Sequence, residues 1–558
     1  MDEHVAGEPA GGPDPFVPNG GTELPQPMGP PTGPAMGPPP PWAPEVLDSG
    51  TAPTWSVLPG GDGTDGGAPT GRRRSRALVV GVTAAAVLVT AGGAYAAWSR
   101  LNGNGPQPAE VLPAGTVAFA EVDLDPSAGQ KLALFNLLHK FPDSSGLKST
   151  DTDFGDWLVR RLSEAGSSGD ALDFGKDVQP WLGKRFAVAA VPAPAGSGTG
   201  GSPVDGVLVV QETDEQAATA AMTKLRAHGS DHLGFALADG YLVVTPDSAT
   251  GAAKIVADGQ KSSLAADARF TSDVDSLGSD QVVTAWVDAA KAGQLLKDSL
   301  GNVAGVDSGQ LDAVLGASWK GRWVLGIHAA DESVEMRVRT FGAASSAPQA
   351  PPVKLAHVAP DAFAVLAVSG YGRSVSEQWK QLSSLPGYSA IADQARQAGL
   401  TLPDDLVALV GDQLTLSVGG DPTGTPSVLA AATSKDPQAG KAVLDKLLAL
   451  AGPDLALGLS TTVDGDTLYV GSSDDVVAAG KGSASAAKVT DSDLFRAAVA
   501  DPDHAQAILY VNLVKLWSSL KASGTTVGSP ELQNLKAVGI SATTSGGDSD
   551  VTVRVVIG

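Results

Sequence analysis

One order of predicted strands and helices occurs twice in this chain of 558 residues, and this repetition limits the fold more than any other feature. A Pro-led strand opens each copy, at residues 112–122 and 359–368, and an amphipathic helix follows at residues 129–141 and 374–385. Apolar residues recur at helical spacing in the helices and alternate in the strands. A repeated order of elements indicates one structural unit that is present twice.

Two Asp-Gly turns align the copies. Asp239-Gly240 and Asp464-Gly465 each lie between apolar alternations, and Asp-Gly in that setting is a strong signal for a β-hairpin. The strands after these turns come in the same order in both copies: 281–287 and 507–511, then the pairs 323–327 with 334–340 and 537–542 with 551–557. Hairpins with inserted helices predict an α+β fold, a tandem duplicated unit of antiparallel or mixed sheet with helices on one face. Periodicity does not decide whether the copies form one continuous sheet or two domains.

A membrane span is predicted before the repeats. Four arginines between Arg72 and Arg76 precede an uncharged stretch that begins at Ala77 and ends at Trp98, and its 22 residues would extend about 33 Å as a helix. This is long enough to cross the lipid bilayer, and the excess of arginine before it places the N-terminus in the cytoplasm. A cleaved signal peptide is the alternative because Ala94-Tyr95-Ala96 resembles a cleavage site, but the polar leader is too long for an ordinary one.

Residues 1–70 form a Pro/Gly-rich tail with 17 of the 39 prolines, 14 glycines, and no lysine or arginine. Such a segment cannot bury enough apolar surface to fold, so we expect it to be disordered, and its proline runs could dock to a cytoplasmic binder of Pro-rich motifs. The formal charge of −23 argues against nucleic acid as a partner. The absence of cysteine excludes disulfides and Cys-ligated metals.

These observations divide the chain into six predicted parts. They are a disordered cytoplasmic tail (1–70), a basic flank with a transmembrane helix (71–98), a stalk (99–110), an extracytoplasmic repeat 1 (111–342), a linker (343–353) and an extracytoplasmic repeat 2 (354–558).

No set of residues in the sequence makes a convincing reaction centre. His228 and His232 are four residues apart but lack a third metal ligand, and the glycine run at 196–201 is not followed by a helix that could bind phosphate. Further weak candidates are the carboxylate pairs Asp273/Asp275 and Asp491/Asp493, Ser518 with Lys521, and a groove beside Trp319 and Trp323. We assign no catalytic, cofactor-binding or metal-ligating residue, and we expect no cofactor.

The opening Leu112-Pro113-Ala114-Gly115-Thr116, together with the tail, the arginine-flanked span and the Asp-Gly hairpins, resembles actinobacterial single-pass membrane proteins of domain-of-unknown-function family 3352. The resemblance covers about residues 111–558 and implies no functional residue. We therefore predict a membrane-anchored module of the bacterial cell envelope that binds an envelope lipid, glycan or protein beside or between its copies. The alternatives are a hydrolase that acts on envelope polymers or lipids, and a scaffold that links the envelope to cytoplasmic partners through the tail.

Overall fold

The computed structural model describes the chain from residue 107 to its end, with internal gaps. The gaps are residue 125 and residues 142–171, 194–202, 228–232, 247–248, 279–280, 301–319, 343–348, 359–361, 384–387, 421–425, 452–457, 483–488 and 523–529. The chain divides into two units, Met1–Ala68 and Pro69–Gly558, and every described residue belongs to the second. The predicted tail (1–70) and span (77–98) lie outside the described residues. Within the described part of the chain, no helix is long and apolar enough to cross a membrane.

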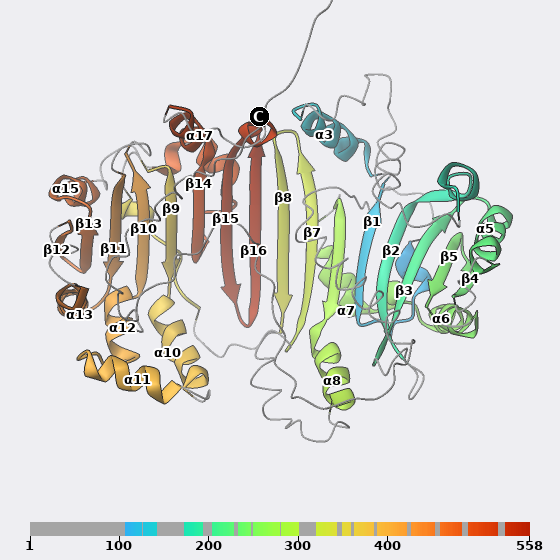
Figure 1. The fold of residues 1–558 in the computed structure, drawn as a ribbon, viewed down its shortest axis with the longest axis horizontal. Helices are drawn as coiled ribbons and strands as arrows, with labels where there is room; N and C mark the ends of the chain where they lie inside the picture. The colour runs from blue at the N-terminus through green and yellow to red at the C-terminus, as the bar shows by residue number, and fades with distance from the viewer. Residues whose placement is uncertain are drawn as a thin grey trace, which may run out of the picture. The chain divides into compact units, whose positions relative to one another are not determined.

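The described residues form one antiparallel sheet of 16 strands (Figure 1). The first half of the chain contributes β1 (Ala118–Asp123), β2 (Leu182–Pro192), β3 (Val204–Glu212), β4 (Gly234–Ala238), β5 (Tyr241–Thr245), β6 (Val283–Asp288), β7 (Arg322–Ala330) and β8 (Ser333–Phe341). The second half contributes β9 (Ala364–Ser369), β10 (Gln413–Gly419), β11 (Ser427–Thr433), β12 (Ser460–Asp464), β13 (Thr467–Gly471), β14 (Ala507–Asn512), β15 (Leu535–Ser545) and β16 (Asp548–Ile557).

The strand order is the same when it is followed inward from either edge. From one edge it runs β4-β5-β3-β2-β1-β6-β7-β8, and from the other it runs β12-β13-β11-β10-β9-β14-β15-β16. The two runs meet where β8 pairs with β16, so the sheet is continuous. Two residues are called matched below when they hold the same register place in strands of the same rank, or the same place in the helices that follow those strands.

Helices join the strands in a similar order in both halves. The first half contains α2 (Pro108–Val111), α3 (Ala128–Leu138), the π-helical turn η2 (Phe174–Val178), α5 (Glu215–Ala227), α6 (Ala249–Lys261), η4 (Leu264–Ala266), α7 (Ala268–Asp275) and α8 (Ala289–Leu300). The second half contains η6 (Leu355–His357), α10 (Tyr371–Leu382), α11 (Tyr388–Gln397), α12 (Asp404–Val410), α13 (Pro437–Ala451), α15 (Asp474–Gly482), η8 (Val489–Asp491), α16 (Asp493–Ala498), α17 (Leu513–Ala522) and η9 (Pro530–Asn534).

The prediction that the helices cover one face of the sheet is wrong. Successive residues of a strand point to opposite faces, and on β3 Val209 packs in one core cluster while Val210 packs in another. The first cluster contains Phe119 and is covered by α2, α6 and α7; we call this side the Phe119 face. The second lies with α5 on the other side, which we call the Val122 face. Both faces of the strands are apolar, so each requires a helical layer.

The predicted hairpins are confirmed. β4 and β5 pair around Asp239-Gly240, and β12 and β13 pair around Gly465. Asp239 and Gly240 have φ of 51° and 78°, and Gly465 has φ of 59°. These left-handed conformations are what a two-residue hairpin turn requires, and Gly and Asp adopt them at low cost.

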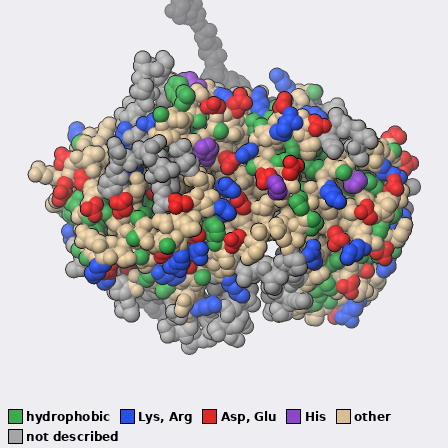
Figure 2. All heavy atoms as spheres, turned by 180° about the vertical axis from the view of Figure 1, so that it is seen from behind, with side chains coloured by type: hydrophobic (Ala, Val, Ile, Leu, Met, Phe, Trp, Pro, Cys, Tyr) green, Lys and Arg blue, Asp and Glu red, His purple; other side chains and the backbone are tan. Residues whose placement is uncertain are grey.

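The halves join through charged residues on the Phe119 face. Arg337 of β8 donates hydrogen bonds from its Nε and Nη2 atoms to the carboxylate of Asp550 of β16, and Arg554 of β16 donates to Glu335 of β8 at 2.6 Å. Figure 2, which shows the molecule from behind relative to Figure 1, has acidic and basic side chains interspersed over the surface. These pairs are half-exposed, so they fix the register of the two strands more than they stabilise the fold.

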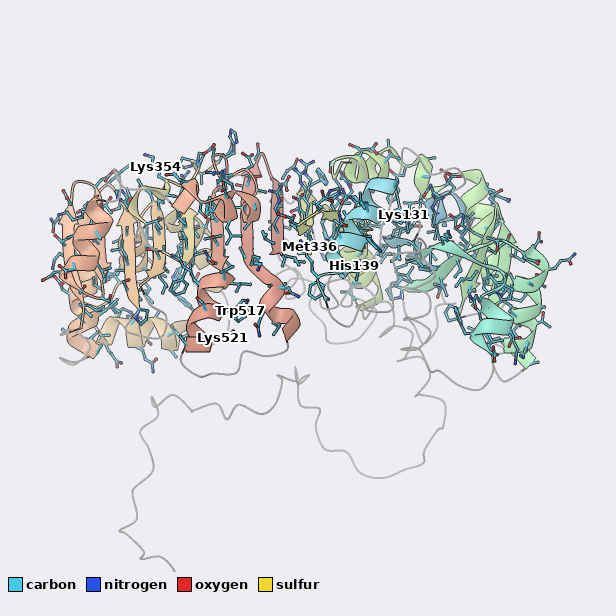
Figure 3. The ribbon with its side chains drawn as sticks, turned by 90° about the horizontal axis from the view of Figure 1, so that it is seen from above. Lys131, His139, Met336, Lys354, Trp517 and Lys521 are labelled. Atoms are coloured by element: carbon cyan, nitrogen blue, oxygen red, sulfur yellow. The ribbon has the colours of Figure 1, made fainter. Side chains whose placement is uncertain are left out.

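On the Val122 face the join is apolar and is closed by α3. Met336 of β8 packs in the same cluster as Leu134 of α3, and the Nζ of Lys140 donates to the carbonyl of Ile557 at 2.9 Å. In the view from above in Figure 3, Met336 lies between the labelled residues His139 of the first half and Trp517 of the second. The helix of the first half therefore contacts the last strand of the second.

A histidine in the second half makes the stability of the fold depend on pH. The Nδ1 atom of His357 lies 2.9 Å from the Tyr469 hydroxyl, and partial burial lowers the pKa of His357 below its ordinary value of 6.5. The native state therefore resists protonation of His357. The stability that the neutral ring contributes is lost as pH falls below about 6.5. His504, whose exposed ring has its pKa raised by Asp501, contributes in the opposite direction.

We expect the His357→Gln variant to lose less stability than the wild type between pH 7 and pH 5, because the variant has no imidazole to protonate at that place. Urea unfolding at several pH values measures this. The His504→Gln variant is the control, and its stability should fall more steeply than that of the wild type. Parallel curves for the wild type and His357→Gln would contradict the prediction.

Candidate functional site

An apolar cavity of about 560 Å³ lies in the first half, on the Val122 face near the β4 edge. Its floor is formed by β2, β3 and β5, and its sides by η2 and α5. Small-molecule sites have volumes of about 300–1,000 Å³, so the cavity is large enough for a ligand. It lies within one half and not between the two.

Aliphatic side chains dominate the wall of the cavity. The main contributors are Val178, Val188, Leu208, Met222, Leu225, Leu242 and Val244. Leu208 is 42% exposed although it points from the middle of a strand, so part of its surface faces the cavity instead of the core. Of the described lining residues, Trp181 and Thr245 carry polar side-chain atoms, and the Trp181 indole N–H is donated to the Asp177 carbonyl at 2.6 Å. The cavity thus offers few hydrogen-bonding groups to a ligand.

The local sequence explains the position of this wall. Asp173 caps η2 by accepting the amide hydrogen of Lys176, and the short turn brings Trp181 over the sheet as a 5% exposed anchor. Helix α5 begins after Asp214, whose Oδ1 accepts the amide of Ala217 at 3.0 Å. Its apolar side, which includes Met222, then faces η2 and the strands.

The second half replaces η2 with the longer helix α12. Gly440 of α13 packs against this helix so tightly that a Cβ atom there would lie 2.6 Å from the Ala408 carbonyl oxygen. The matched residue of α5 is Ala218, and Gly206 of the cavity wall is matched by Val428. No local motif marks the cavity. A comparison of matched residues in the two halves is the sequence signal that could have located it.

A cation–carboxylate bridge holds α5 to η2 beside the cavity. Lys224 pairs with Asp177, and this ammonium keeps the pKa of Asp177 below its usual range. The matched residue Lys446 lies 3.8 Å from Asp405 of α12. The same kind of bridge joins α12 and α13 in the second half, so we interpret it as part of the fold and not of the site.

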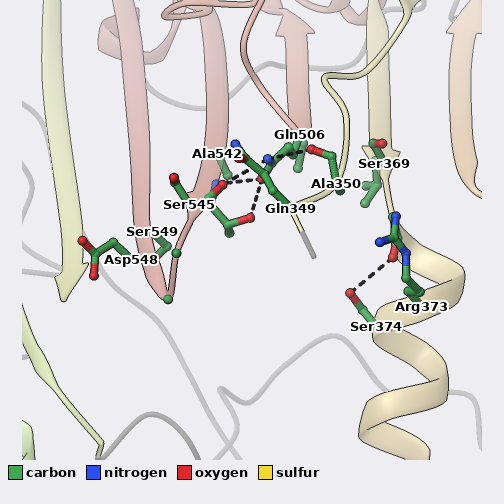
Figure 4. Close-up of a pocket in the computed structure, with 16 residues that line it drawn as sticks. Gln349, Ala350, Ser369, Arg373, Ser374, Gln506, Ala542, Ser545, Asp548 and Ser549 are labelled. Atoms are coloured by element: carbon green, nitrogen blue, oxygen red, sulfur yellow. Dashed lines mark hydrogen bonds between the residues drawn. The ribbon is translucent and has the colours of Figure 1, made fainter. Parts of the chain in front are cut away.

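A second pocket, of about 400 Å³, lies at the ends of β9, β14 and β15 (Figure 4). Polar side chains line much of it, among them Arg373, Asp548 and Gln506. The amide nitrogen of Gln506 donates to the carbonyls of Ala350 at 2.9 Å and Thr544 at 3.1 Å. Its amide oxygen accepts from the backbone and the hydroxyl of Thr544. All four hydrogen-bonding places of this side chain are occupied within the protein, which favours a structural role.

Buried charges in the first half form a third cluster. Asp123 of β1 is fully buried and receives a hydrogen bond from the Nε of Arg185 at 3.2 Å, while Glu121 and Tyr241 lie buried beside them. Burial raises the pKa of Tyr241 far above its ordinary value. This cluster lies on the Phe119 face under helices, and none of its residues lines the cavity.

The structure describes some of the weak candidates from the sequence and leaves others untested. Asp273 receives hydrogen bonds from Trp286 at 2.9 Å and Arg322 at 2.7 Å, so it is a buried structural partner. His228, His232, Trp319 and the glycine run at 196–201 lie outside the described residues. Among the residues that are described, no group of three or more His, Asp or Glu is arranged to hold a metal ion.

Comparisons with known proteins give little further information. No protein-family model matches the chain, and no curated protein matches its sequence. Two solved structures, crystal forms III and I of TP0453, share 11% and 10% identity with this chain. Each match covers 44% of this chain and 84% or 83% of the other, with TM-scores of 0.21 and 0.20.

Proposed function

We propose that this protein is a membrane-anchored, extracytoplasmic module of the bacterial cell envelope that binds the acyl chain of a lipid in the cavity of its first half. The observation that carries the proposal is the cavity itself, whose described wall is almost entirely aliphatic. A glycan would need hydrogen-bonding partners along its length, and these are scarce in that wall. The uncharged stretch from Ala77 to Trp98 and its flanking arginines support the anchored topology.

We also propose that the halves are two copies of one duplicated unit. The shared strand order supports this, as do the matched registers: Asp123 lies opposite Arg185, and the matched Ser369 lies opposite Gln413. On this proposal one copy keeps a compact helix pair and the other has acquired a binding cavity.

The expected affinity follows from the apolar character of the wall. Each buried methylene contributes about 0.8 kcal/mol, so about ten methylenes supply about 8 kcal/mol. This free energy corresponds to a Kd of about 1 μM before the cost of ordering the chain is subtracted. Such a site would exchange its ligand with a membrane instead of holding it permanently.

Photo-crosslinking tests the proposal on the full-length chain in envelope vesicles. We expect a diazirine-bearing fatty acid to label peptides from β2, β3, α5 and β5, in addition to the predicted span, which serves as an internal reference. The Leu208→Trp variant fills the cavity and should reduce labelling of these peptides about tenfold, equivalent to about 1.4 kcal/mol.

Val428→Trp is the control for the cost of placing a tryptophan on the sheet. Val428 is 42% exposed, as Leu208 is, and it lies on the matched strand β11 away from the cavity. It should leave the labelling unchanged while it costs the fold about as much. Absence of labelling within the first half, or equal loss in both variants, would refute the proposed function.

A further inference from the structure

Arg226 is a cation beside the cavity that has no carboxylate partner in the described part of the chain. Arg226 lies in the last turn of α5, and its guanidinium carbon is 5.8 Å from the centre of the Phe235 ring. Phe235 pairs with Val244 of β5, which lines the cavity, and Leu225 lines it as well. Arg226 therefore lies at the border of the apolar wall. Among the described residues no acidic side chain pairs with it, whereas its neighbour Lys224 is bound to Asp177.

The second half shows that the fold does not require this cation. Helices α5 and α13 both begin after a capping aspartate, Asp214 or Asp436, which fixes their alignment. In this alignment Lys224 matches Lys446, and Arg226 matches Leu448. The lysine that forms the bridge is present in both halves. The arginine is present in the half that has the cavity.

We infer that the ligand is a single-chain amphiphile with an anionic headgroup, and that Arg226 binds that headgroup while the chain lies in the cavity. This inference rests on the proposed function. The guanidinium of Arg226 lies over an aromatic ring, and its planar donors match a carboxylate or a phosphate. A small number of polar groups around an apolar pocket is enough to orient a ligand. Here Arg226 would fix which end of the amphiphile faces outward.

The test compares two probes of equal chain length in the photo-crosslinking assay, a diazirine-bearing fatty acid and the corresponding fatty alcohol. In wild-type protein at pH 8 the acid should label the cavity peptides more strongly than the alcohol does. The Arg226→Leu variant, which introduces the residue of the second half, should lower labelling by the acid about tenfold and leave labelling by the alcohol unchanged. Arg226→Lys should keep most of the preference for the acid, because it keeps the charge.

The outcomes separate this inference from the proposed function. If neither probe labels the cavity, the proposed function fails. If both probes label it and Arg226→Leu weakens both equally, Arg226 acts by packing on Phe235, and the inference of an anionic headgroup is overturned. An unchanged preference for the acid in Arg226→Leu also overturns it. Arg496→Gln removes an exposed, salt-bridged arginine and is the control for general charge effects.

Discussion

Replacing Arg185 with Gln is expected to lower the free energy of unfolding by about 3–5 kcal/mol, because it leaves buried carboxylates without their cation. The side chains of Asp123 and Arg185 are 0% and 7% exposed and face each other across β1 and β2. Glu121 lies two residues from Asp123 on the same strand and face, and is 2% exposed. Arg185 thus pairs with Asp123 beside a second buried carboxyl group.

The second half supplies the matched rescue. Its residues at these places are Ser369 and Gln413, which lie opposite each other as Asp123 and Arg185 do. The double variant Asp123→Ser with Arg185→Gln removes both charges of the pair and leaves Glu121 as the remaining buried carboxyl group. It should therefore recover part of the loss, about 2 kcal/mol, since replacing a buried pair costs less than breaking it.

Guanidinium unfolding followed by tryptophan fluorescence measures both effects. Lys441→Gln, which removes an exposed bridge to Asp445, is the control and should change stability by less than about 0.5 kcal/mol. A loss below about 1 kcal/mol in Arg185→Gln, or a double variant less stable than the single one, would show that the pair does not hold this core together.

Local patterns in the sequence were sufficient to predict the elements but not their assembly. The Asp-Gly hairpins and the strands of both halves were predicted because turn chemistry and two-residue alternation act over a few positions. The face that a helix covers depends on which strand neighbours carry apolar residues on that side, and β3 carries them on both. Pairing between β8 and β16 joins segments about 200 residues apart, and no local signal encodes it.

The cavity was not predicted for a related reason. Its wall is made of ordinary core residues such as Met222 and Val244, and a sequence pattern cannot distinguish a residue that faces a cavity from one that faces another side chain. Comparison of the halves supplies the missing information, because Ala218 against Gly440 and Arg226 against Leu448 become visible once the register is known.

An isolated second half, residues 349–558, is expected to form a dimer through β16. In the whole chain Thr552 lies opposite Arg337, and these two residues hold the same place in β16 and β8, so the join has approximate twofold symmetry. A true twofold would place β16 against its own copy, with Asp550 opposite Arg554, which is a favourable pair. The exposed edge of a ten-residue strand also strongly favours pairing.

Sedimentation velocity at tens of micromolar should therefore show a dimer for this half, and Asp550→Arg should shift it to a monomer because it places two arginines opposite each other. The first half, residues 107–342, should dimerise more weakly, because the same twofold symmetry would place Arg337 opposite the Arg337 of a second copy. In the whole chain Arg337 faces Asp550 instead, so the charges at the join favour pairing between the two halves over pairing of either half with itself. A monomeric, folded second half would show that the strand edge alone does not drive this pairing, and that the link between the halves is needed to form the continuous sheet.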